Sequence, residues 1–143
     1  MSDMDRTDPG GPDGASVVEV KTAATAALIP TIRAVASDLA ARADFDLDAI
    51  SDLRMAVDEA CATLVDIAAP GSSLRCAFSV HDERIGVEAE VDVAAPDTTV
   101  STDTFGWRVL QTLADEVELV GAKTNGRPTV GIKLDKRAAA LPR

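Results

Sequence analysis

The chain has 143 residues, of which 46% are hydrophobic and only 3% aromatic, so it can form one domain whose core depends on aliphatic side chains. Its 14 basic and 24 acidic residues give a net charge of −10, which would repel nucleic-acid phosphates and anionic membranes and suits a basic protein partner or a small molecule. No apolar run approaches the ~20 residues of a membrane-spanning helix, and the N-terminus lacks a signal peptide's basic start, so we expect a cytoplasmic protein.

The first predicted elements are a tail, a strand and a helix. Residues 1–15 are rich in Asp, Gly and Pro and should form a disordered acidic tail. Residues 16–22, SVVEVKT, are rich in β-branched side chains, which predicts a strand at a sheet edge. Residues 24–43 show helical periodicity, and Pro30 falls in the first turns, where its missing N–H is tolerated. The predicted apolar stripe of this helix is Leu28, Ile32, Val35 and Leu39.

A second helix is predicted within residues 44–71. Asp46 or Asp48 would cap its start, and the pair Pro70 and Gly71 would end it. Its predicted core stripe is Leu53, Val57, Ala60, Leu64 and Ile67.

Two strands with alternating apolar residues follow, at residues 74–80 and 85–93, joined by the hairpin-length link HDER. Residues 94–104 are polar and turn-forming and should be a loop. Cys61, in the second helix, and Cys76, in the first of these strands, have no metal-type spacing, so we interpret both as buried reduced thiols. The predicted buried faces are Leu74, Cys76, Phe78 and Val80 in the first strand and Ile85, Val87, Ala89, Val91 and Val93 in the second.

A third helix, from 105 to 114 with Asp103 or Thr104 as its cap, and two closing strands, EVELV and TVGIKL, complete the pattern. The turn GAKTNGRP, at residues 121–128, would join these strands. The order strand, helix, helix, strand, strand, helix, strand, strand predicts an α/β two-layer sandwich. In it, one mixed, mostly antiparallel sheet is covered on one face by three helices.

This domain would span residues 16–136 and leave residues 137–143 as a C-terminal tail. The single histidine, His81, falls at the predicted hairpin turn, with no metal-type or Ser/His/Asp constellation to join. The sequence therefore predicts no metal site that protein side chains alone would form.

Two segments carry a resemblance to a known family: the run from Arg33 through DLDAISDLRMAVDEAC, and FGWRVLQTLADEVEL. Together with the element order, they resemble the anti-sigma factors of the RsbW and SpoIIAB type, which belong to the histidine-kinase-like (GHKL) ATPases. The resemblance covers nearly all of the chain beyond the N-terminal tail. It implies the histidine-kinase-like ATPase (Bergerat) fold.

The resemblance also implies nucleotide-binding positions on the second helix. The family offers Glu-x-x-x-Asn there, and Glu59 matches the Glu while Thr63 replaces the Asn. Glu59 is thus the candidate catalytic and nucleotide-binding residue, although a solvated helix acid is the plainer interpretation. The Thr63 hydroxyl is shorter than an Asn amide and a poorer magnesium ligand.

Two further motifs of the family are degenerate here. The motif Asp-x-Gly-x-Gly corresponds to DVAAP, where Asp92 stands in the acidic position without the glycines; alternatively, Asp92 is the outward residue of an alternating strand. In the third motif Gly106 remains, but Phe105 and Trp107 flank it, and their rings would crowd the phosphate end unless Trp107 packs in the core. The resemblance therefore implies that binding of ATP with magnesium is weak or lost.

Arg33, which lies 26 residues before Glu59, matches the family arginine that contacts sigma factor and antagonist; the alternative is a solvated helix arginine. The resemblance implies an anti-sigma factor that forms a homodimer, sequesters an alternative, stress- or sporulation-type sigma factor, and is released by STAS-type anti-anti-sigma proteins. The main alternative is an ATP-dependent serine-protein kinase that phosphorylates its STAS antagonist with Glu59 as base. A small-molecule sensor that reuses the old pocket is a third possibility.

Overall fold

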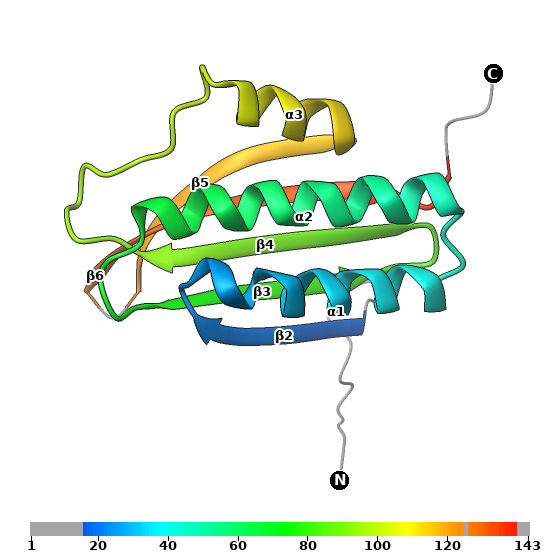
Figure 1. Cartoon of the computed structure of the whole chain (residues 1–143), viewed down its shortest axis with the longest axis horizontal. Helices are drawn as coiled ribbons and strands as arrows, with labels where there is room; N and C mark the ends of the chain where they lie inside the picture. Colours follow the sequence, from blue (N-terminus) through cyan, green and yellow to red (C-terminus); the bar gives the residue numbers. More distant parts are fainter. Residues whose placement is uncertain (1–15, 125, 140–143) are drawn as a thin grey trace, which may run out of the picture.

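The computed structural model describes residues 16–124 and 126–139, and in these residues three α-helices cover one face of a five-stranded sheet (Figure 1). This arrangement confirms the expected two-layer α/β sandwich. The elements, in chain order, are β2 (Ser16–Ala23), a short 3-10 turn η2 (Ala26–Leu28), α1 (Ile29–Arg42), α2 (Leu47–Ile67), β3 (Ser73–Val80), β4 (Arg84–Asp92), α3 (Phe105–Leu113), β5 (Glu116–Thr124) and β6 (Arg127–Arg137).

The strand order is β2-β3-β4-β6-β5, and all four neighbouring pairs of the described sheet are antiparallel. The expected mixed pairing is therefore absent from this part of the chain. The reason lies in the connections: the two helices between β2 and β3 return the chain to the sheet in the opposite direction. β4 and β5 run parallel, but β6 lies between them, so they do not pair.

The hairpin between β5 and β6 is tighter than the sequence predicted. The eight-residue turn expected at 121–128 is wrong, because β5 continues to Thr124 and β6 begins at Arg127. Gly126, in this turn, has a φ of +78°, a left-handed conformation that favours glycine. Residue 125 lies outside the described residues.

The core between the two layers follows the predicted alternation on β3 and β4 and most of the predicted stripe on α2. At the ends of these patterns, Val80 and Ile67 are only partly buried. The predicted residues that are buried are Leu53, Val57, Ala60, Leu64, Leu74, Cys76, Phe78, Ile85, Val87, Ala89, Val91 and Val93.

The stripe predicted for α1 is partly wrong. Ile32 is buried as expected, but Val35 and Leu39 are only partly buried and pack at the margin of the core. Ala36 and Ala40 lie at the centre of the interface instead, because their small side chains let α1 pack closely against its neighbours. The full set of buried α1 residues is Ile29, Ile32, Ala36 and Ala40.

Side-chain caps begin two of the helices. Asp46 is the N-cap of α2 and accepts a hydrogen bond from the backbone N–H of Ala49 at 2.8 Å. Thr104 is the N-cap of α3 and accepts from the N–H of Trp107 at 3.1 Å. The sequence left two candidates for each cap, and the structure selects Asp46 and Thr104.

The described chain remains attached to the fold beyond β6. The N–H of Ala138 donates to the carbonyl of Glu83 at 2.9 Å, and its carbonyl accepts from the N–H of Asp46 at 3.1 Å. The whole tail predicted at 1–15 lies outside the described residues, and so do residues 140–143 of the tail predicted at 137–143. In the described part of the chain, no helix is both long and apolar enough to cross a membrane.

Asp46→Ala should lower the free energy of unfolding by about 1 kcal/mol, because it leaves an N–H of the first turn of α2 without its acceptor. Asp48→Ala is the matched control: Asp48 also lies in the first turn but is not the cap, so its loss should cost only the weaker helix-dipole interaction. Urea unfolding would measure both. Equal losses for the two variants would contradict the cap assignment.

Candidate functional site

The candidate site begins on the flank of α2 that faces α3. Glu59 and Thr63 lie one turn apart on this flank and are both partly buried. The hydroxyl of Thr63 donates to Oε2 of Glu59 over 3.3 Å. A threonine has only one O–H to donate, so this contact leaves its lone pairs but no proton for any other partner.

The N-terminus of α3 closes on the same carboxylate, and Gly106 makes this possible. A Cβ built at Gly106 would collide with Oε2 of Glu59 and would lie 3.2 Å from its Cδ. Only a residue without a side chain therefore lets α3 approach α2 this closely without moving Glu59. Three of the predicted nucleotide-site residues, Glu59, Thr63 and Gly106, are thus brought together.

The two rings beside Gly106 point to different environments. Trp107 is only 7% exposed and belongs to the core, which confirms the core-packing interpretation of this residue. Phe105 is 83% exposed, so its ring does not fill the interior. The expectation that both rings crowd the site is therefore wrong: one ring is in the core and the other is in solvent.

Asp92 lies away from this group. Its two valine neighbours on β4 and in the following loop are buried toward the helices, so Asp92 faces the open side of the sheet. There the guanidinium of Arg75 contacts Asp92 Oδ1 through Nη2 and Glu90 Oε1 through Nε, each at 3.1 Å. The structure therefore does not bring Asp92 close to Glu59. Arg75, Glu90 and Asp92 form the Arg75 cluster, and strand alternation is the sequence signal that could have predicted its position on the open face.

Arg33, the predicted partner-binding residue, makes a contact inside the chain. Its Nη1 lies 2.9 Å from Oδ2 of Asp58, so the ion pair joins α1 to α2. Both side chains are 35% exposed, while the other oxygen of Asp58 is buried without a hydrogen-bond partner among the described atoms. Sequence reasoning missed Asp58, because it lies 25 residues from Arg33 and no local spacing pattern links the two residues.

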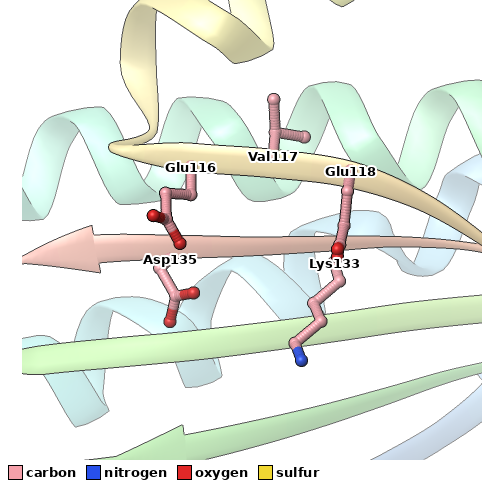
Figure 2. A pocket seen from close by; sticks show the side chains of 5 residues that line it. All are labelled: Glu116, Val117, Glu118, Lys133 and Asp135. Atoms are coloured by element: carbon pink, nitrogen blue, oxygen red, sulfur yellow. The ribbon is translucent and has the colours of Figure 1, made fainter.

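Two hollows lie on the open face of the sheet. One, of about 570 Å³, is lined by residues of β2, β3 and β4. A second, of about 380 Å³, lies over β5 and β6, where Glu116, Glu118 and Asp135 stand near a single lysine, Lys133 (Figure 2). Neither hollow is lined by Glu59, Thr63 or Gly106.

The arrangement does not fit ATP with magnesium. The space beside the N-terminus of α3 is occupied by the Glu59 carboxylate, and Thr63 is bonded to that carboxylate. Asp92 faces the other side of the sheet. Among residues 16–124 and 126–139, no group of three His, Cys, Asp or Glu side chains is placed to hold a metal ion.

The two cysteines meet in the core. Their sulfur atoms are 3.9 Å apart, and both residues are free and buried, as the sequence predicted. The hydrogen bond with Cys76 and burial raise the pKa of the Cys61 thiol far above its usual range. Cys61 is therefore a neutral thiol at physiological pH. The contact between the cysteines was missed, because it depends on how α2 lies over β3.

Comparisons with known proteins agree with this fold. The model of the histidine kinase-like ATPase domain family matches residues 22–130. Two relatives, from the CDC 1551/Oshkosh and ATCC 25618/H37Rv strains of Mycobacterium tuberculosis, both carry the name Anti-sigma-F factor RsbW. Each is 35% identical to this chain over an alignment of 148 positions, which covers 100% of this chain and 86% of the relative.

Gly106→Ala should be less favourable in the wild-type chain than in a Glu59→Ala background. In the background variant the added methyl group meets no carboxylate, so part of the gain of about 0.5–1 kcal/mol known for a glycine inside a helix should appear, since Gly106 lies in the first turn of α3. In the wild type, the collision with Glu59 offsets this gain. Urea unfolding of the four proteins should give a coupling energy of about 0.5 kcal/mol or more. The same effect of Gly106→Ala in both backgrounds would contradict the contact.

Cys61 should make stability decrease at alkaline pH. The unfolded chain loses this proton above a pKa of about 8.5, while the folded chain keeps it, so the unfolded state then binds fewer protons. The contribution is fully present below that pH and declines above it by up to about 1.4 kcal/mol per pH unit. Urea unfolding between about pH 8 and about pH 10 should show a shallower decline for Cys61→Ala than for the wild type. Because the chain has no tyrosine, few other groups change charge in this range. Parallel curves would contradict the raised pKa.

Proposed function

The chain belongs to the histidine kinase-like ATPase domain family, and we propose that it is an anti-sigma factor that acts by binding its partners rather than by nucleotide chemistry. The observation that carries this proposal is the 35% identity, over the whole chain, to a protein named Anti-sigma-F factor RsbW. The closed contact between Glu59 and Gly106 supports the second half of the proposal, since it leaves the predicted nucleotide residues engaged with one another.

In this function the protein binds an alternative, stress- or sporulation-type sigma factor and keeps it from RNA polymerase. A net charge of −10 complements a basic sigma-factor surface and would speed association at low salt. A STAS-type anti-anti-sigma protein competes for the same surface and releases the sigma factor. The proposed working form is a cytoplasmic homodimer that engages one sigma factor.

Arg33 is the proposed partner contact on this surface. Its side chain remains 35% exposed although its guanidinium is bound to Asp58, so one side of the group can meet a partner. Asp58 holds the guanidinium in position, which lowers the entropy lost when a partner binds. Arg42, also on α1, offers a comparison, because it is 76% exposed and pairs with Asp38 on the same helix.

Arg33→Glu should weaken binding of the sigma factor by about tenfold or more, because it replaces an interfacial cation with an anion. Arg42→Glu changes the charge of the same helix equally and should have a small effect. Titration calorimetry with each alternative sigma factor of the source organism is the measurement. Unchanged affinity for Arg33→Glu would remove this residue from the interface.

A second variant separates partner contact from internal structure. Arg33→Glu combined with Asp58→Arg restores an ion pair between α1 and α2 with the charges exchanged. If Arg33 contacts the partner directly, the double variant should bind as weakly as Arg33→Glu. Recovery of wild-type affinity would mean that the residue acts only by holding the two helices together.

The same titrations with magnesium-ATP test the role of nucleotide. Affinity should be unchanged, because the Glu59, Thr63 and Gly106 arrangement does not fit the nucleotide. Tighter binding with magnesium-ATP, or transfer of radiolabel from ATP to a STAS partner that is abolished by Glu59→Ala, would instead favour the kinase alternative. Absence of binding to every alternative sigma factor would overturn the anti-sigma proposal.

A further inference from the structure

The edge strand β5 has one side to which no other strand is bonded. It is nine residues long and pairs with β6 over its whole length, but no described strand lies on its other side. Figure 1 shows β5 at the margin of the sheet opposite β2. The backbone groups along the free side of such a strand can pair with a further extended segment.

Pro128 of β6 indicates which residues of β5 face outward. Its carbonyl accepts a hydrogen bond at 3.0 Å from the N–H of Val93, which follows β4, so the even-numbered residues of β6 bond to β4. Val117 and Leu119 lie opposite even-numbered residues of β6, so they exchange no hydrogen bonds with that strand. The N–H and C=O groups of Val117 and Leu119 therefore point away from the sheet.

The open face of this edge carries acidic side chains. Glu116 lies directly opposite Asp135, which brings two like charges together, and Glu118 lies opposite Lys133. Figure 2 shows these side chains around the hollow of about 380 Å³. Both glutamates are exposed, and neither makes an ion pair in the described part of the chain. A cation beside them would offset the repulsion between Glu116 and Asp135.

The other face of the same edge is apolar. Val117 and Leu119 are partly buried and pack against the core, on the side where α3 contacts β5. Because residues that pair across two strands share a face, a segment that adds to β5 would place alternate side chains beside the glutamates and beside these apolar residues. A segment that alternates basic and apolar residues is therefore complementary to both faces.

We propose that β5 binds an extended segment of a partner protein that carries basic residues at two alternate positions and apolar residues between them. The segment adds a sixth strand to the sheet through the outward groups of Val117 and Leu119, and its basic side chains lie opposite Glu116 and Glu118. These are non-hydrogen-bonded positions, where side chains of paired strands come closest. The net charge of −10 favours the approach of such a segment.

This surface is separate from the one proposed around Arg33, so the inference goes beyond the proposed function. α1, which carries Arg33, contacts β3, whereas α3 is the helix that contacts β5. The other edge strand suits the segment less well. On the open face of β2, Glu19 is followed two residues later by Lys21, so one of the two basic side chains would meet a like charge there.

A labelled synthetic peptide that alternates lysine and valine over about ten residues is the probe, and fluorescence anisotropy measures its binding. It should bind the full chain with a micromolar Kd. A peptide with glutamate in place of lysine should not bind, and one with the lysines and valines in separate blocks should bind at least about tenfold more weakly. Equal affinity for the block peptide, or no binding of the alternating one, would overturn the proposal.

N-methylation tests the strand pairing. In the proposed register the valines of the probe lie opposite Val117 and Leu119, so their N–H groups point to β5, whereas those of the lysines point to solvent. N-methylation of the valines should abolish binding, and N-methylation of the lysines should leave the affinity unchanged. The two methylated peptides have the same composition and the same charge. Equal affinity of these two peptides would contradict the addition of a strand.

Charge reversal on β5 locates the site. Glu116→Lys should weaken binding of the probe by about tenfold or more, while it places a base opposite Asp135 and so removes a repulsion from the folded chain. Glu88→Lys is the matched control, because Glu88 is exposed on the same face but lies on β4, an interior strand. It makes the same charge change and should alter the affinity by less than about twofold. Equal losses for the two variants would overturn the assignment to β5.

A reversed pair completes the test. The double variant Glu116→Lys/Glu118→Lys should bind the peptide that alternates glutamate and valine, which the wild type does not bind, because the opposite charges are restored with their signs exchanged. Failure of this exchange, with the variant shown to be folded by urea unfolding, would contradict the proposed pairing. Since the probe is a synthetic peptide, the result is independent of whether the chain binds a sigma factor.

Discussion

The close approach of α3 to α2 is the contact on which the rest of the candidate site depends. With the Glu59 side chain in its observed position, glycine at position 106 leaves open the space that a Cβ would take. The N-terminus of a helix is the positive end of its dipole and favours a carboxylate, so the contact is electrostatically favourable as well as close. The N-terminus of α3 could otherwise bind the phosphates of a ligand, but here it lies against a carboxylate of the same chain.

Helix α2 therefore carries three contacts at once. Its buried stripe packs on the sheet, its Glu59 flank meets α3, and its Asp58 side is joined to α1 by Arg33. Two hollows lie on the open face, where the Arg75 cluster and the residues near Lys133 form a mixed and mainly acidic surface. An acidic surface of this kind supports the proposed binding of a basic protein partner.

The parts of the fold that could be predicted from sequence are those that depend on one element alone. Alternation gave the buried faces of β3 and β4, and the capping chemistry of aspartate and threonine left only two candidates at each helix start. The errors concern contacts between elements: the periodicity of α1 favoured Val35 and Leu39, whereas close packing selected Ala36 and Ala40. The Arg33–Asp58 and Cys61–Cys76 contacts join residues of different elements, so no spacing rule within one element could have revealed them.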